Sequence, residues 1–194
     1  MSFLDGNGYE YYVSINGTMD DERSVINETD QTVYLIEDHE KGETLTPIGE
    51  MGGDINVTKI VNHLFSNNID EANAMSIFDF YEAVKGEGKW DYKSLETSIF
   101  YYKNNSKFQY YTEDRFYSME SQDFGNFHYG VVGKALSNVP ELILRMGAGA
   151  AQILSGNSKP ELITPGLMEF PHGDDPRDQG WIGVGFEHFN RLIK

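Results

Sequence analysis

The chain has 194 residues and a formal net charge of −16, because 31 Asp and Glu residues outnumber 15 Lys and Arg residues. This length is sufficient for one full hydrophobic core, or for one core with a small appendage. The absence of cysteine excludes disulfides, thiolate metal sites and a cysteine nucleophile. Because its apolar runs are much shorter than the ~20 residues of a membrane-spanning helix, we expect no membrane insertion. We also expect no signal peptide, since the N-terminus lacks a basic region followed by an apolar one.

The N-terminal quarter has the aromatic and β-branched composition of strands. A strand is expected at 9–15, and Asn16-Gly17 directly after it is a strong hairpin signal. A second strand is expected at 32–36 and a third at 44–49. Pro47 predicts an edge position for the third strand, because proline cannot donate a hydrogen bond to a neighbouring strand.

Gly52-Gly53 marks a change from strand-like to helix-like patterning. We place a domain boundary there, between a β-rich connector or docking unit at 1–53 and a mainly helical domain at 54–194. The sequence therefore predicts an α+β fold, in which an antiparallel β-unit precedes a helical domain with glycine-rich site loops.

Several helices are expected after the boundary. Asp54 or Asn56 is placed at the start of the first, and Asp70 at the start of the second. Residues 108–117 are assigned to a further helix. The glycine-rich stretch at 125–130 is expected to be a loop, with a helix opening behind it at Val131.

Pro140 is expected at the first turn of another helix, which ends at Gly156. The residues between them are apolar nearly all round, which predicts a buried central helix.

Three polar clusters flanked by glycine or proline lie far apart in the sequence. They are Trp90-Asp91-Tyr92-Lys93, Phe124-Gly125-Asn126-Phe127-His128-Tyr129-Gly130 and Gly173-Asp174-Asp175-Pro176-Arg177-Asp178-Gln179. Glycine lets the backbone approach a ligand or another chain closely. We therefore predict that the three clusters converge in one composite site.

The order of these clusters resembles the bacterial polymorphic toxin type 44 domain, over about Val57 to Phe189. The resemblance implies an antibacterial effector domain, carried by a larger secreted toxin or secretion-system protein and delivered into a target bacterium. It further implies a hydrolase, with ribonuclease activity as the usual prediction, and a cognate immunity protein as partner. His128 stands where the family pattern more often has a second Asn, so the resemblance implies no family-wide catalytic role for it.

The second cluster contains our candidate general base, His128, because an imidazole titrates near neutrality. Asn126 and Tyr129 are candidates to donate hydrogen bonds to a phosphoryl or carbonyl oxygen. A structural alternative remains for two of these residues. His128 can be a histidine at the edge of the core, and the side chain of Asn126 can form a hydrogen bond within its own turn.

The third cluster places the carboxylates of Asp174, Asp175 and Asp178 within five residues. Such a set is suited to Mg²⁺ or Ca²⁺, which prefer oxygen ligands. The alternatives are an N-cap for the last helix, formed by Asp174 or Asp175, and a carboxylate that orients a histidine.

In the first cluster, Lys93 is a candidate to stabilise negative charge in a transition state, and Asp91 to hold it in place. The alternative is an ordinary exposed ion pair. Lys93 also belongs to the one dense run of lysines, which is interleaved with aromatic residues. The run comprises Lys85, Lys89, Lys93, Lys103 and Lys107, with Trp90, Tyr92, Tyr101 and Tyr102. A solvated surface is the simpler interpretation of this run, and a nucleic-acid surface is the alternative.

Three functions remain open. The first is RNA cleavage, with His128 or His172 as base and Lys93 neutralising the phosphorane. The second is hydrolysis of peptidoglycan or a lipid-linked precursor in the cell envelope, with the Asp174–Asp178 turn as metal or acid/base site. The third is a non-enzymatic interaction module. The net charge of −16 disfavours RNA more than an envelope substrate.

Overall fold

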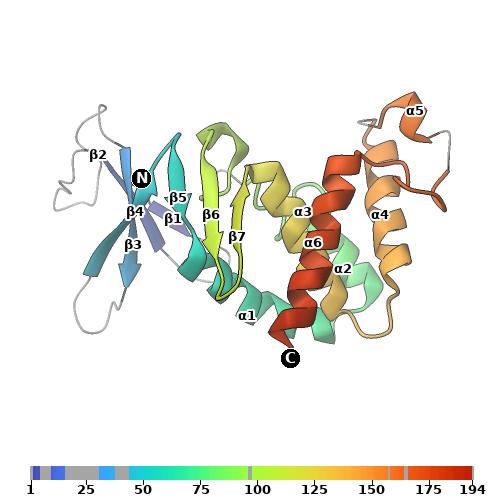
Figure 1. Ribbon diagram of the computed structural model, residues 1–194, viewed down its shortest axis with the longest axis horizontal. Helices are drawn as coiled ribbons and strands as arrows, with labels where there is room; N and C mark the ends of the chain where they lie inside the picture. The colour runs from blue at the N-terminus through green and yellow to red at the C-terminus, as the bar shows by residue number, and fades with distance from the viewer. Residues whose placement is uncertain are drawn as a thin grey trace. The chain divides into compact units, whose positions relative to one another are not determined.

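The computed structural model describes residues 2–4, 10–15, 31–37, 44–95, 98–156, 158–163 and 166–193. The chain divides into two compact units. Unit 1 comprises Met1–Leu64 and Asp91–Ser121, and unit 2 comprises Phe65–Trp90 and Gln122–Lys194. Unit 1 contains the β-sheet and unit 2 contains most of the helices, so the predicted α+β class is confirmed (Figure 1).

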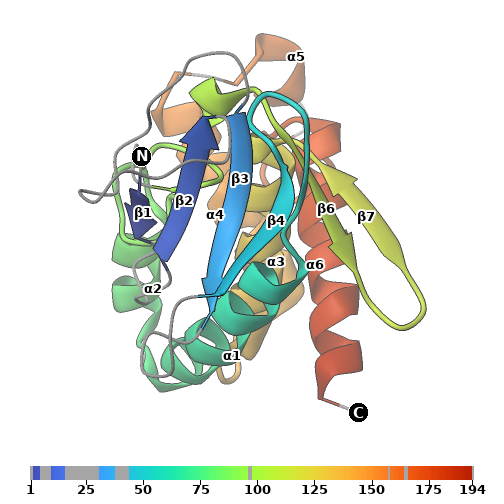
Figure 2. The ribbon, with the colours of Figure 1, turned by 90° about the vertical axis from the view of Figure 1, so that its left-hand side faces the viewer.

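The sheet of unit 1 has seven strands, which follow one another in the order of the sequence. They are β1 (Ser2–Leu4), β2 (Glu10–Ile15), β3 (Gln31–Glu37), β4 (Thr44–Glu50), β5 (Asp54–Asn56), β6 (Lys107–Tyr111) and β7 (Phe116–Met119). All neighbouring strands are antiparallel except β5 and β6, which are parallel. Figure 2 shows β2, β3 and β4 side by side.

The strands expected at 9–15, 32–36 and 44–49 are confirmed as β2, β3 and β4. The hairpin signal at Asn16-Gly17 lies outside the described residues. The edge position of the third strand is wrong, because β4 lies between β3 and β5. Proline is accommodated there because β4 pairs with β5 only through Gly49 and Ile55. On its other side Pro47 faces Tyr34, next to a register shift in β3.

The sheet continues past Gly53, since β5 pairs with β4 and β6 pairs with β5. A turn joins β4 to β5, with Gly52 at a φ of +79° and the Gly53 N–H donating to the Glu50 carbonyl over 2.9 Å. The domain boundary at this turn stays a prediction.

The helix expected at 108–117 is wrong, since β6 and β7 form a hairpin there. Alternate residues of the two strands are buried, among them Phe108, Tyr110, Tyr117 and Met119. The Thr112 N–H donates to the Arg115 carbonyl over 2.8 Å and closes the turn. Period-2 alternation of aromatic side chains is the mark of a strand, and it overrides the acidic residues of the turn, which imitate the start of a helix.

Helix α1 runs over Thr58–Ala74, and Asn56 Oδ1 accepts a hydrogen bond from the Thr58 N–H over 3.1 Å at its start. The expectation for Asp70 is wrong, because it lies inside α1. Instead Ser76 begins α2 (Ile77–Val84): its Oγ accepts from the Asp79 N–H, and Asp79 accepts from the Ser76 N–H. This reciprocal capping satisfies two N–H groups that the helix leaves unpaired.

The remaining helices are η1 (Tyr102–Asn104, a 3₁₀ turn), α3 (Ser121–Ala135), α4 (Glu141–Leu154), α5 (Pro160–Ile163) and α6 (Pro176–Leu192). None of the described helices is long and apolar enough to cross a membrane.

The loop expected at 125–130 is wrong, because these residues belong to α3. Their glycines allow close packing against α6 within unit 2. A Cβ atom on Gly130 would lie 2.3 Å from the Ile182 carbonyl oxygen, and one on Gly185 would lie 2.3 Å from the Phe127 carbonyl oxygen. The two helices therefore pack backbone against backbone at this point.

Helix α4 starts after Pro140 as predicted, but it is not a buried central helix. Leu142, Ile143 and Leu154 are 41%, 43% and 83% exposed. One face is covered, where Leu144 contacts the backbone of Gly133 in α3. Gly149 on α4 packs against the His172 carbonyl, which leaves no space for a side chain.

Gly130→Ala is expected to destabilise the protein by about 2–3 kcal/mol, because the new methyl group meets the backbone of α6. Gly180→Ala is the matched control in the same region, since a Cβ atom there meets nothing within 4 Å. This control should stabilise α6 by up to ~1 kcal/mol. Urea unfolding of both variants measures the difference, and equal midpoints would contradict the close contact between α3 and α6.

Candidate functional site

His128 lies in the core of unit 2 and is 1% exposed. Asn68 Nδ2 donates to its Nε2 over 2.9 Å, which places the ring proton on Nδ1. The rings of Phe65, Trp90 and Phe124 surround it at centroid distances of 6.1, 5.7 and 6.1 Å. Burial lowers the pKa of His128 to about 3, because a charged imidazole is poorly solvated there. Its role as general base stays a prediction, and the burial favours the alternative of a core histidine.

Tyr129 is a neighbour of His128 in α3 and contacts α4. Its hydroxyl donates to the Leu144 carbonyl over 2.7 Å. Burial raises the pKa of Tyr129, and the nearby Asp174 carboxylate raises it further. The second and third clusters are therefore close enough in unit 2 for one charge to affect the other. Asn126 Nδ2 is buried and has no hydrogen-bond partner among the described residues.

Asp175 is the N-cap of α6, as one of the alternatives for the third cluster predicted. Its Oδ1 accepts from the Arg177 N–H over 2.8 Å, and Pro176 occupies the first turn of the helix. This cap satisfies one of the N–H groups that every helix leaves unpaired at its start.

Asp174 is 2% exposed. Its Oδ1 accepts from the Asp175 N–H and its Oδ2 accepts from Gln179 Nε2, each over 2.9 Å. Burial nevertheless raises the pKa of Asp174, since the loss of water outweighs these hydrogen bonds. Gln179 is held in turn by α4, because Arg145 Nη1 donates to its Oε1 over 3.1 Å.

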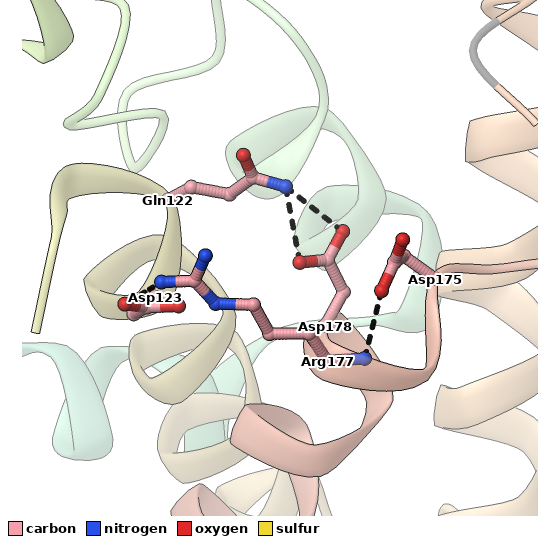
Figure 3. A network of polar contacts seen from close by, with 5 residues as sticks. All are labelled: Gln122, Asp123, Asp175, Arg177 and Asp178. Carbon is pink, nitrogen blue, oxygen red and sulfur yellow. Dashed lines mark hydrogen bonds and ion pairs between the residues drawn. The ribbon is translucent and has the colours of Figure 1, made fainter.

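Asp178 accepts hydrogen bonds from two glutamine side chains, of which Figure 3 shows that of Gln122. Gln122 Nε2 lies 3.0 and 3.1 Å from its two carboxylate oxygens, and Gln152 Nε2 lies 3.4 Å from Oδ2. The Gln152 side chain also acts on Asp174 and lowers the pKa of its carboxyl group, against the larger effect of burial.

Arg177 and Asp123 form an ion pair between the first turns of α6 and α3 (Figure 3). Arg177 Nη2 lies 2.7 Å from Asp123 Oδ2, with the arginine side chain 58% exposed and the aspartate side chain 4% exposed. Together with Gln122 and Asp178, these side chains hold the two helix starts together.

Sequence reasoning missed several members of this network. Gln122 and Asp123 directly precede the second cluster, and Arg177 and Gln179 are part of the third, so the motifs themselves carried a signal. Gln152 had none, because it lies on a helix whose sequence is dominated by apolar residues.

No group of three or more His, Asp or Glu side chains among the described residues is arranged to hold a metal ion. The carboxylates of the third cluster instead point to separate partners. Asp174 contacts Gln179, Asp175 caps α6, and Asp178 contacts Gln122. The Mg²⁺ or Ca²⁺ site stays a prediction, and these contacts give it no support.

The first cluster is divided between the two units. Trp90 is buried in unit 2 and contacts Phe80 and His128 at centroid distances of 6.3 and 5.7 Å. Asp91 is 7% exposed and Lys93 is exposed, and both belong to unit 1. The convergence of all three clusters therefore stays a prediction. Within unit 2, Trp90 meets the second cluster and Asp174 meets Tyr129.

An α+β fold that carries these three clusters in this order belongs to the class of bacterial toxin domains. The family model of bacterial toxin 44 matches residues 79–191, and the chain is a member of this family. No curated protein and no solved structure matches the chain. Membership makes the chain a bacterial toxin or effector domain, and such toxins are expected to have a cognate immunity partner.

The burial of His128 predicts acid sensitivity. Above pH 6.5 the imidazole is neutral in both the folded and unfolded states, so it has no effect on the free energy of unfolding. Between pH 6.5 and about 3 the unfolded state takes up a proton that the folded state does not, and stability falls by ~1.4 kcal/mol per pH unit. His128→Phe is expected to remove this slope in urea unfolding measured from pH 7.5 to 5.

His63→Gln provides the control, because His63 is only partly buried on α1 and the variant should keep the slope of the wild type. An unchanged slope in His128→Phe would mean that the imidazole gains its proton without leaving the folded core.

Proposed function

We propose that this toxin domain hydrolyses a glycan of the bacterial cell envelope, in peptidoglycan or a lipid-linked precursor, by acid/base catalysis with Asp174 and Asp178. The observation that carries the proposal is that Asp174 and Asp178, both buried at the start of α6, have different hydrogen-bond partners: Gln179 for Asp174, and Gln122 and Gln152 for Asp178.

The surroundings of the two acids differ. Asp174 is enclosed and its raised pKa favours the protonated acid, which can donate to a leaving oxygen. Asp178 accepts hydrogen bonds from the amides of Gln122 and Gln152. Glycoside hydrolysis requires two carboxyl groups, one of which donates a proton to the leaving oxygen.

The local charge supports a glycan rather than RNA. The network contains four carboxyl groups, those of Asp123, Asp174, Asp175 and Asp178, and two guanidinium groups, those of Arg145 and Arg177. A polyphosphate is repelled by this arrangement and by the net charge of −16, whereas the glycosidic bond of a sugar chain is neutral.

One observation favours RNA cleavage as a second candidate. His172 Nδ1 lies 2.9 Å from the Leu167 carbonyl and must donate to it, so Nε2 carries the lone pair of a base. The residue has a φ of +64°, and unusual backbone geometry of this kind concentrates at functional sites. A base two residues before Asp174 suits removal of a 2′-hydroxyl proton.

Asp174→Asn and Asp178→Asn are each expected to reduce release of soluble fragments from purified peptidoglycan by at least about a hundredfold. The wild-type rate should fall at high pH, where Asp174 gives up the proton that its raised pKa favours. Mass spectrometry of the fragments identifies the bond that is cleaved.

Asp70→Asn is the matched control, because Asp70 is an exposed carboxylate on α1. Single-stranded RNA is incubated in parallel with the wild type and His172→Ala. RNA cleavage that depends on His172, with intact peptidoglycan, would replace the glycan proposal by the second candidate.

A further inference from the structure

Arg145, a half-buried residue of α4, is a cation without an acidic partner. Two other cations of unit 2 are paired: Lys134 with Glu141 over 2.6 Å, and Arg177 with Asp123 over 2.7 Å. Arg145 forms no ion pair in the part of the chain that the structure describes. In a chain with 31 acidic and 15 basic residues, an arginine that is left without a carboxylate calls for an explanation.

The guanidinium of Arg145 is nevertheless held in place by α6. Nη1 donates to the Gln179 carbonyl over 2.8 Å and to Gln179 Oε1 over 3.1 Å. Gln179 Nε2 donates in return to the Arg145 carbonyl over 3.2 Å. The ring of Phe186 lies with its centroid 5.1 Å from Arg145 Cζ, within the range of a cation–π contact. A ligand of this guanidinium would therefore bind to a group that is already ordered.

One edge of the guanidinium of Arg145 remains open. The group has five N–H bonds, of which Nη1 carries two, Nη2 two and Nε one. Nε and Nη2 donate to no residue of the described chain, and neither is a buried atom that lacks a partner. Both atoms therefore face solvent. An edge of this kind binds a carboxylate through two parallel hydrogen bonds.

A glycine of α6 leaves the space that Nη2 occupies. A Cβ atom on Gly183 would lie 2.7 Å from Arg145 Nη2, which is closer than the two atoms can approach. Because Nη2 is at the end of a flexible side chain, an alanine at this position would move the guanidinium rather than the helix. Gly180, three residues earlier on α6, has no atom within 4 Å of such a Cβ position.

The open edge belongs to the candidate site, because Gln179 connects Arg145 to Asp174. The Gln179 amide accepts from Arg145 through Oε1 and donates to Asp174 Oδ2 through Nε2 over 2.9 Å. One amide group therefore separates the guanidinium from the carboxyl group that is proposed as the proton donor.

We propose that Arg145 binds a carboxylate of the substrate through Nε and Nη2, so that the candidate site recognises a glycan with isolated carboxylate groups. The inference rests on the proposed function, since it names the substrate group that is bound beside the proposed acid. Arginine suits this role better than lysine because its planar fork matches the geometry of a carboxylate. Peptidoglycan has carboxylates in two places, on the lactyl ether of N-acetylmuramic acid and on its peptides.

A single open guanidinium suits a polymer with sparse negative charge. A nucleic-acid strand has a charge at every nucleotide, and the net charge of −16 repels those that Arg145 does not bind. A glycan with isolated carboxylates presents one charge to the guanidinium and uncharged sugar rings to the rest of the site.

Two soluble oligosaccharides of equal length, titrated by calorimetry, test the inference. One alternates N-acetylglucosamine with N-acetylmuramic acid, and the other consists of N-acetylglucosamine alone, without a carboxylate. The full chain with Asp178→Asn is the parent, so that neither ligand is cleaved. Arg145→Gln is expected to weaken binding of the carboxylated ligand by about tenfold or more and to leave the neutral ligand unaffected, because only the former loses charged hydrogen bonds.

Gly183→Ala tests the same contact without removing the arginine. It is expected to weaken binding of the carboxylated ligand by about fivefold, the effect of one lost hydrogen bond, because the methyl group displaces Nη2. Gly180→Ala is the matched control and should bind as the parent does. Arg145→Lys keeps the charge but not the fork, so it should bind more weakly than the parent. If thermal unfolding shows that Arg145→Gln is unfolded, Gly183→Ala and Arg145→Lys decide the case.

A third ligand, the alternating oligosaccharide with its peptides attached, distinguishes the two sources of the carboxylate. If binding depends on Arg145 only when the peptides are present, the carboxylate is on the peptide, and the inference stands. Binding that depends on Arg145 supports the inference even if the wild type cleaves no glycan, so the two proposals fail separately.

Four results would overturn the inference. They are unchanged binding of both carboxylated ligands by Arg145→Gln, equal weakening of the carboxylated and neutral ligands in a folded variant, no binding of any oligosaccharide by the parent, and binding that depends on Arg145 for single-stranded RNA alone.

Discussion

The close contact between α3 and α6 is the constraint on which the organisation of unit 2 depends. Gly130 and Gly185 let the two backbones approach to a distance that no side chain would permit. Because the helices are so close, the polar residues at their first turns also meet, and Asp123 pairs with Arg177 while Gln122 contacts Asp178. The candidate site is therefore a consequence of helix packing, and its geometry would be lost if the helices moved apart.

The same packing explains why α3 serves two purposes along its length. The first turn of α3 is polar and directed at the site, whereas His128 further along faces the aromatic core. A histidine in that position needs a hydrogen-bond partner, and Asn68 supplies one. Burying this pair in place of two apolar residues makes the core dependent on pH, which an all-aromatic core would not be.

The sequence was sufficient for features that depend on local signals, and insufficient for those that depend on packing. The strands β2 to β4 and the N-cap at Asp175 could be predicted because alternation and capping are properties of short segments. The glycines of α3 were wrongly assigned to a loop. Glycine occurs both in loops that need its backbone freedom and in helices that pack closely together, so its presence in the sequence does not distinguish the two cases. Likewise, nothing in the sequence of α4 identifies Gln152 as a partner of Asp178, because that contact depends on how α4 and α6 lie in space.

The acidity of the chain bears on the candidate site. Burial disfavours the charged form of Asp174 and raises the pKa of its carboxyl group above that of an ordinary aspartate. Such a site, with further carboxylates around it, repels anionic polymers. The proposal of an uncharged glycosidic bond as the target follows from this charge, because a polyphosphate would meet carboxylates at the site and a net charge of −16 over the chain.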